Sequence, residues 1–249
     1  MKHTQTQKIR RAVLIGISGI LIAAISVATT LAYLSTVTNV KDNVFTASGN
    51  IVGRVLEPHW ETNDGHYVPG RRVSKDPTVD NETSDAKCYA GLKLAFFIDD
   101  GSGYQQVDLA TMQKFVDFEN LTGSGWVAAD PNNANDMCKY YLYDNLLDVD
   151  ADTGTTLGST ANDHTSAIFT AVIPKKDLNI KTTGTAHIGD LTGSTQLKDI
   201  TFGRFDFKIK VYAHGAKSAN ADGSGVTVSK SECQGEIMTA LKAIAATAN

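Results

Sequence analysis

The residues of this chain best suited to chemistry are three aspartates at alternating positions in one short segment, Asp148, Asp150 and Asp152. Alternating aspartates in a tight loop present carboxylate oxygens to one side, and such oxygens are the ligands that Ca²⁺ prefers. The segment departs from an EF-hand loop, because Thr153 stands at the sixth position and Ser159 where the bidentate glutamate belongs. We therefore expect at most weak Ca²⁺ binding, with a dissociation constant on the order of 10⁻⁴–10⁻³ M, and no other cofactor. A solvated acidic loop is the alternative.

The patterns typical of enzymes do not occur in the sequence. There is no HExxH zinc motif, no GxSxG nucleophile turn and no phosphate-binding P-loop. His59 and His66 lie among acidic residues, where a metal site and a solvated loop are both open interpretations. We expect that the protein is not an enzyme.

The chain has three cysteines, Cys88, Cys138 and Cys233. An odd number cannot pair completely within one chain, so at most one disulfide and one spare thiol are expected. No CxxC pair occurs, which disfavours a zinc site or a redox dithiol. The sequence leaves the disulfide state open, and three small buried side chains are the simpler interpretation.

Charge is distributed unevenly along the chain. Residues 1–32 carry four basic residues and no acidic one, so their removal changes the formal net charge from −4 to −8. A mature chain this acidic repels the phosphate backbone, and we expect no nucleic acid partner.

The N-terminus has the pattern of a secretory signal peptide. Residues 1–11 are polar and basic, and residues 12–28 form an apolar run without a charge. Thr30 and Ala32 provide the small side chains that a signal peptidase requires three residues and one residue before the cut, which places cleavage before Tyr33. A retained membrane anchor is the alternative, since the apolar stretch continues through Leu34. We thus expect a signal helix at 1–32 and one mature domain at 33–249.

The mature chain predicts many short strands between turns. The strongest strand candidates are residues 86–98, 139–143, 166–173 and 201–213, and a hairpin turn is predicted at 99–103. In the last strand Phe205, Phe207 and Ile209 alternate with Asp206, Lys208 and Lys210, which predicts a half-buried antiparallel strand. Residues 109–119 predict one or two helical turns, and 231–248 predict a C-terminal helix capped by Ser231. This pattern favours a mainly β fold, an antiparallel β-sandwich with a short C-terminal helix.

Several motifs occur in a characteristic order along the chain. They are residues 32–35 (AYLS), 43–50 (NVFTASGN), 56–60 (LEPHW), 75–81 (KDPTVDN), 139–143 (KYYLY) and 167–174 (AIFTAVIP). This ordered set resembles the TasA/camelysin family, whose members are exported by a SipW-type alternate signal peptidase. The resemblance covers residues 12–245 loosely, and the insert at 144–165 and the three cysteines depart from the family pattern.

The resemblance implies a jelly-roll sandwich and a structural role in the extracellular fibres or biofilm matrix of a Gram-positive bacterium. It also implies assembly by strand addition through the N-terminal arm, residues 33–50, in which Val37, Val40 and Val44 are the apolar positions. The alternative is that the arm folds back as the first strand of its own sandwich. A monomeric, adhesin-like surface module is the competing function, and a companion anchor protein is left open.

Overall fold

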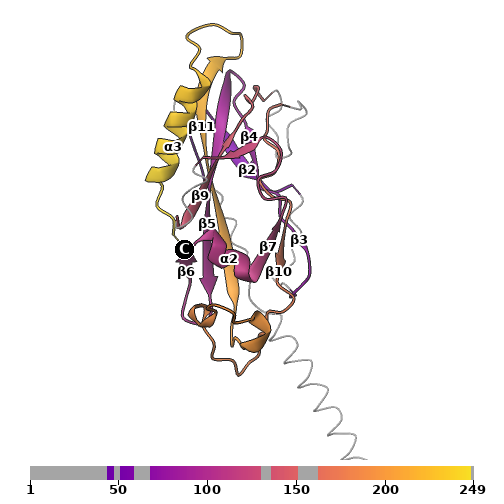
Figure 1. The fold of residues 1–249 in the computed structure, drawn as a ribbon. Helices are drawn as coiled ribbons and strands as arrows, with labels where there is room; N and C mark the ends of the chain where they lie inside the picture. The colour runs from indigo at the N-terminus through magenta and orange to yellow at the C-terminus, as the bar shows by residue number, and fades with distance from the viewer. Residues whose placement is uncertain (1–43, 48–50, 59–67, 130–135, 151–161, 248–249) are drawn as a thin grey trace, which may run out of the picture.

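The computed structural model describes residues 44–47, 51–58, 68–129, 136–150 and 162–247, with backbone only for 44–47 (Figure 1). Two long strands form its centre, β5 (Ala86–Asp99) and β11 (Asp206–Asn220). They pair antiparallel along their whole length, from Asp206 opposite Asp99 to Asn220 opposite Ala86, with one register shift after Lys217. Their apolar and aromatic residues favour extended backbone.

The remaining strands of the main sheet are shorter. β9 (Cys138–Tyr143) pairs with the other edge of β5, and β8 (Trp126–Ala128) lies beyond it. β6 (Gln105–Val107) returns along the end of β5 after the predicted hairpin turn, and β1 (Val44–Ala47) pairs with β11. The strand order is therefore β1-β11-β5-β9-β8.

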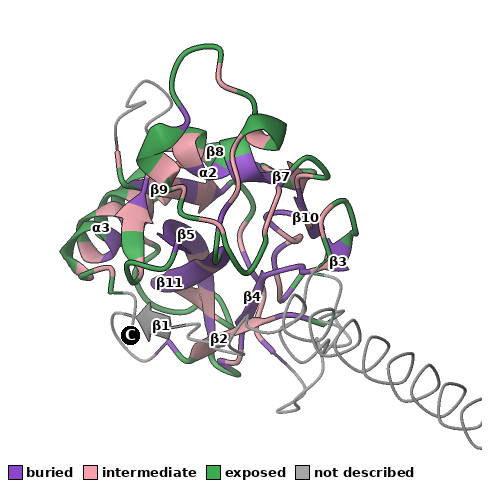
Figure 2. Ribbon diagram, turned by 90° about the horizontal axis from the view of Figure 1, so that it is seen from below, coloured by how far each residue is buried: buried purple, intermediate pink, exposed green. Residues whose placement is uncertain are grey.

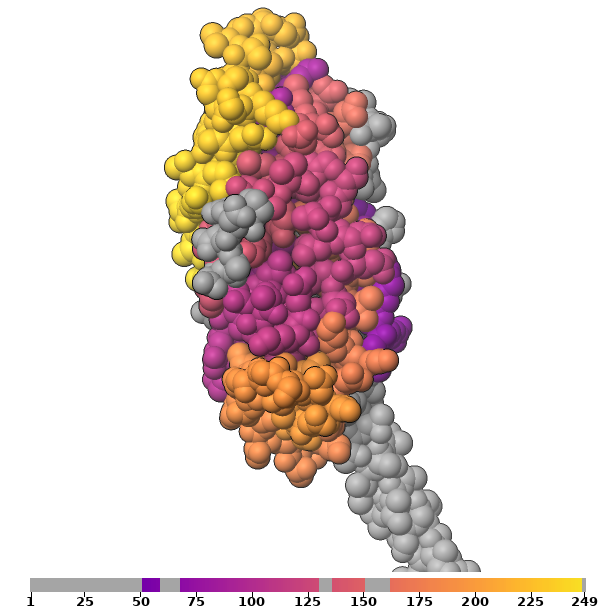
Figure 3. Space-filling view, viewed as in Figure 1, coloured from indigo at the N-terminus to yellow at the C-terminus, as the bar shows by residue number. Residues whose placement is uncertain are grey.

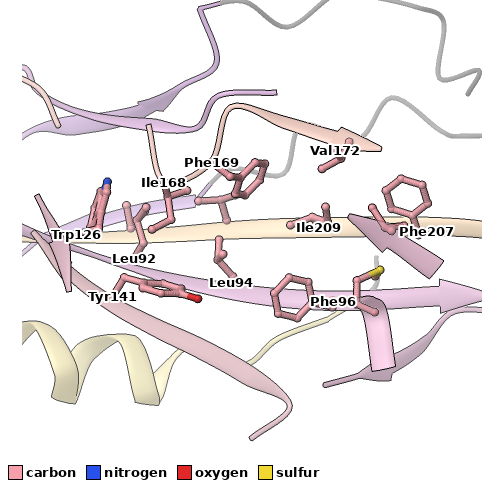
Figure 4. Close-up of a cluster of buried hydrophobic side chains, with 14 of the residues drawn as sticks. Leu92, Leu94, Phe96, Trp126, Tyr141, Ile168, Phe169, Val172, Phe207 and Ile209 are labelled. Carbon is pink, nitrogen blue, oxygen red and sulfur yellow. The ribbon is translucent and has the colours of Figure 1, made fainter. Parts of the chain in front are cut away.

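Two small sheets form the opposing layer. One contains β3 (Val73–Ser74), β10 (Ala171–Pro174) and β7 (Val116–Glu119), and the other pairs β2 (Gly53–Leu56) with β4 (Thr78–Asn81). Apolar side chains fill the space between the layers (Figure 4). The ring of Phe118 lies 5.8 Å from that of Phe96 in β5 and 5.4 Å from that of Phe169. The predicted mainly β, sandwich-like fold is thus confirmed.

Helices cover the strands from outside. α3 (Lys230–Ala243) packs Cys233, Ile237 and Leu241 against the outer face of the main sheet. In Figure 2, β5 and β11 run buried between α3 on one side and the β3–β10–β7 sheet on the other. α2 (Leu109–Phe115) leads directly into β7, and residues 175–204, with the short 3₁₀ turns Ile188–Asp190 and Leu197–Asp199, close one end of the molecule (Figure 3).

Three sequence predictions were wrong in detail. The strand expected at 166–173 begins only at Ala171, although Ile168 and Phe169 are buried in the core. The strand expected to be half-buried is covered on both faces, so that Asp206 and Lys210 are only 2% and 4% exposed. Ser231 is not the cap of α3, because Ser229 occupies that position and forms a capping box with Glu232.

Candidate functional site

The N-terminal arm enters the main sheet at β1. Val44 is the register partner of Tyr212, and Ala47 that of Gly215, in parallel orientation. A tight turn cannot join parallel strands, and here nearly the whole domain separates β1 from β11 in the sequence. β1 also lies beside β2. Hydrogen bonds between strands, rather than a turn, therefore hold β1 in the sheet.

Both faces of β11 are buried where it pairs with β1. Ala213 contributes to the main core at 0% exposure, while Tyr212 and His214, on the opposite face, are also buried. Burial lowers the pKa of His214, and the charge of Glu236 in α3 acts in the opposite direction. β5 fills the second edge of β11. β1 therefore pairs with the edge of this stretch of β11 that β5 leaves open.

The structure describes only part of the predicted arm and none of the predicted cleavage site. Val44 is the first residue of β1, whereas Val37 and Val40 lie outside the described residues, as do Thr30, Ala32 and Tyr33. The described segment pairs with the sheet of its own chain. That arrangement corresponds to the alternative in which the arm of an isolated chain folds back.

The fold separates the aspartates that were predicted to bind calcium. Asp148 is partly exposed, and its Oδ1 lies 2.6 Å from Nζ of Lys87. Asp150 is 2% exposed, and its backbone N–H donates to the carbonyl of Thr83. Asp152 lies outside the described residues. Where side chains are described, no group of three or more His, Cys, Asp or Glu is arranged to hold a metal ion.

Asp150 instead lies near two aspartates that the sequence analysis did not select as site residues. They are Asp80 in β4 and Asp163 in the loop before β10, and they are 1% and 0% exposed. The charges of both Asp150 and Asp163 act on Asp80. An acidic residue inside the otherwise uncharged strand Thr78–Asn81 is the sequence signal that marks Asp80, whereas nothing local distinguishes Asp163.

No family model, curated protein or solved structure matches this chain. Among the described residues, no helix is long and apolar enough to cross a membrane.

The three cysteines are free and buried. Burial raises the pKa of the Cys88 thiol to about 12, with the charge of Cys233 as a smaller cause. Burial also raises the pKa of Cys138 and of Cys233, although Lys93 opposes this effect at Cys138. Since the thiolate is the nucleophilic form, these thiols are poorly suited to covalent catalysis at neutral pH.

Proposed function

We propose that this protein is an exported structural subunit of the extracellular fibres or biofilm-type matrix of a Gram-positive bacterium. The observation that carries the proposal is β1, a four-residue strand from the N-terminal arm that pairs with β11 without a connecting turn. The motif resemblance to the TasA/camelysin family supports it. That resemblance also supports export through a SipW-type signal peptidase, with a companion anchor protein as a further partner at the cell surface.

Assembly follows from exchanging β1 between copies. Once residues 1–32 are removed, the arm of one copy pairs with β11 of the next, and main-chain hydrogen bonds provide the affinity. Donor and acceptor are different surfaces, so the contact is head-to-tail and leads to a filament where the rotation does not close. Because the signal helix must be removed before the arm is free, the uncleaved precursor should not polymerise.

A monomeric, adhesin-like surface module is the second candidate function. The observation that favours it is that β1 already pairs with β11 of its own chain. A chain that keeps its own β1 in place covers this edge of β11, and covered edges do not template further strands.

Truncation of the arm tests the proposal. The mature protein beginning at Tyr33 should form fibres in electron micrographs, whereas a variant lacking residues 33–47 should remain monomeric in sizing chromatography. The circular dichroism spectrum of the truncated variant must retain the β-sheet signal. This control shows that the absence of fibres does not result from unfolding. Undiminished fibres from the truncated variant would rule out strand addition through the arm, and a monomeric mature protein would favour the surface module.

A mixing experiment isolates the acceptor edge. The truncated variant still offers β11 but has no arm to donate, so it should terminate filaments when a small fraction is added to mature protein. Mean fibre length should fall as that fraction rises. A free peptide of residues 33–50 should shorten fibres in the same way, and a scrambled peptide of the same composition is its matched control.

A further inference from the structure

β1 and β11 run side by side in the same direction. Val44 at the start of β1 is the register partner of Tyr212, and Ala47 at its end is the partner of Gly215. The chain continues from β11 through the loop at 221–229 into α3. A force that pulls the N-terminal end of β1 away from this loop therefore acts along both strands, in opposite directions.

β11 is held in the domain independently of β1. Its second edge pairs with β5 from Asp206 to Asn220. Val211 and Ala213 contribute to the main core on one face, and Ala216 packs against the buried side of α3 on the other. A pull on the arm therefore loads the hydrogen bonds between β1 and β11, because β11 itself cannot move with the arm.

α3, which covers β11, is fastened at its end to the same strand pair. Lys93 of β5 is 3% exposed, and its Nζ donates to the carbonyl of Ile244 at the end of the helix. The last carbonyls of a helix lack an intrahelical donor, so the buried ammonium and the helix end stabilise each other. The N–H of Thr247 donates to Oη of Tyr212 at 3.4 Å. The cover of β11 is thus fixed at the residue that pairs with Val44.

The direction of a pull decides how the hydrogen bonds of β1 share the load. Bonds between paired strands lie across the strand axis, and in a parallel pair they are evenly spaced. A pull along the axis strains all the bonds of this four-residue strand together, whereas a pull that peels it from one end breaks them one after another. Forced unfolding is governed by the unfolding barrier rather than by equilibrium stability. A short strand can therefore resist a large force in one direction only.

We propose that the pairing of β1 with β11 is a load-bearing contact, which resists tension between the N-terminal arm and the domain. The source of the tension rests on the proposed function, since the arm of a fibre subunit connects it to its neighbour. A β1 donated to the next copy is pulled from its Ala47 end, and a pull along the strand axis strains the same bonds. The resistance itself belongs to the single folded chain and is measurable without fibres.

Single-molecule force spectroscopy of the protein beginning at Tyr33 tests the proposal. One handle is attached to the N-terminus and the other to a cysteine introduced at an exposed position. Ser224→Cys places the second handle in the loop after β11, so that β1 is pulled along its axis. Lys198→Cys places it at the opposite end of the molecule, so that β1 is peeled back from Val44 (Figure 1). The three native cysteines are buried, and folded protein should therefore be labelled at the introduced thiol.

The force at the first rupture should be severalfold higher for Ser224→Cys than for Lys198→Cys. Both variants keep β1 and β11 unchanged, and denaturant unfolding should give them equal stability, so that the direction of the pull is the only difference. The matched control replaces the N-terminal handle by Val52→Cys, which is 57% exposed and lies after β1. Pulling between this position and Ser224→Cys bypasses β1 and should abolish the high force.

Two results would overturn the proposal. Equal rupture forces in the two directions would show that β1 has no directional resistance. An equally high force from Val52→Cys would show that the resistance lies elsewhere in the domain. Fibre formation by the mature protein decides the proposed function separately, because a subunit with a weak β1 contact can still form fibres and a monomer can still resist a directed pull.

Discussion

Asp206 of β11 lies directly opposite Asp99 of β5, and Arg204 contacts both carboxylates. Both aspartates are buried, and like charges directly opposite one another in a sheet are unfavourable. Nε of Arg204 donates to Asp206 Oδ2 at 2.6 Å, and its Nη2 lies 3.3 Å from Asp99 Oδ2. Burial raises the pKa of Asp206, and the Arg204 hydrogen bond partly lowers it. This guanidinium therefore allows two acids to occupy the end of the central strand pair.

Arg204→Leu should destabilise the protein by about 1–3 kcal/mol at pH 7, because it leaves the buried Asp206 carboxylate without its donor. The loss should be smaller near pH 4, since a carboxyl group with a raised pKa is more readily protonated in the folded state as pH falls. Urea unfolding at the two pH values measures both effects. Lys198→Leu, at an exposed position of the same end of the molecule, is the control, and an equal loss in both variants would contradict the assignment.

Gly91→Ala should loosen α3. A Cβ at Gly91 would collide with Cγ2 of Ile237 and lie 3.2 Å from Cδ2 of Leu142, so about 1–3 kcal/mol of stability should be lost to overpacking. Ile237→Ala in the same chain should recover part of this loss, which a double-mutant cycle detects. Gly235→Ala on α3, where an added Cβ meets no atom within 4 Å, should instead stabilise by about 0.4–1 kcal/mol.

Ser229→Ala should cost about 1 kcal/mol in the free energy of unfolding, because Ser229 Oγ accepts from the Glu232 N–H at the start of α3. Ser231→Ala should change stability by less than about 0.5 kcal/mol, since its side chain is exposed and does not cap the helix. Denaturant unfolding of the two variants gives a direct comparison. A larger loss of stability in Ser231→Ala than in Ser229→Ala would show that α3 begins two residues later.

Secreted protein should begin at or within a few residues of Tyr33, since Thr30 and Ala32 provide the small side chains needed before the cut. N-terminal sequencing of extracellular material checks this. A sequence starting at Met1 would indicate a retained anchor, and one starting beyond Asp42 would show that most of the arm is removed with the signal.

Local patterns predicted much of the fold. β5, β9 and the turn at 99–103 were expected because alternating apolar residues and glycine-containing turns act over a few neighbours. The prediction of a strand at 166–173 was wrong in its start because it also relied on a local pattern alone. An apolar run there marks burial, but Ile168 and Phe169 reach the core from a loop whose amide at Ile168 donates to the carbonyl of Pro77.

The candidate site was less predictable. The sequence drew attention to Asp150 through its spacing from Asp148, yet the fold pairs Asp148 with Lys87 and places Asp150 near Asp80 and Asp163. Likewise, the arm was recognised as a strand former, but its parallel partner in β11 lies at the other end of the domain. Neither relationship has a signature within a short window of sequence.

The sequence by itself determined the mainly β class, the acidity of residues 33–249, the signal-like pattern of the N-terminus and the C-terminal helix, because each follows from composition or from contacts between near neighbours. Only the tertiary structure decided which edge β1 occupies, which serine caps α3 and which aspartates share a buried environment. Strand pairing and desolvation depend on segments that are distant along the chain and adjacent only after folding. The energies of buried carboxyl groups are accordingly set by that packing rather than by residue type.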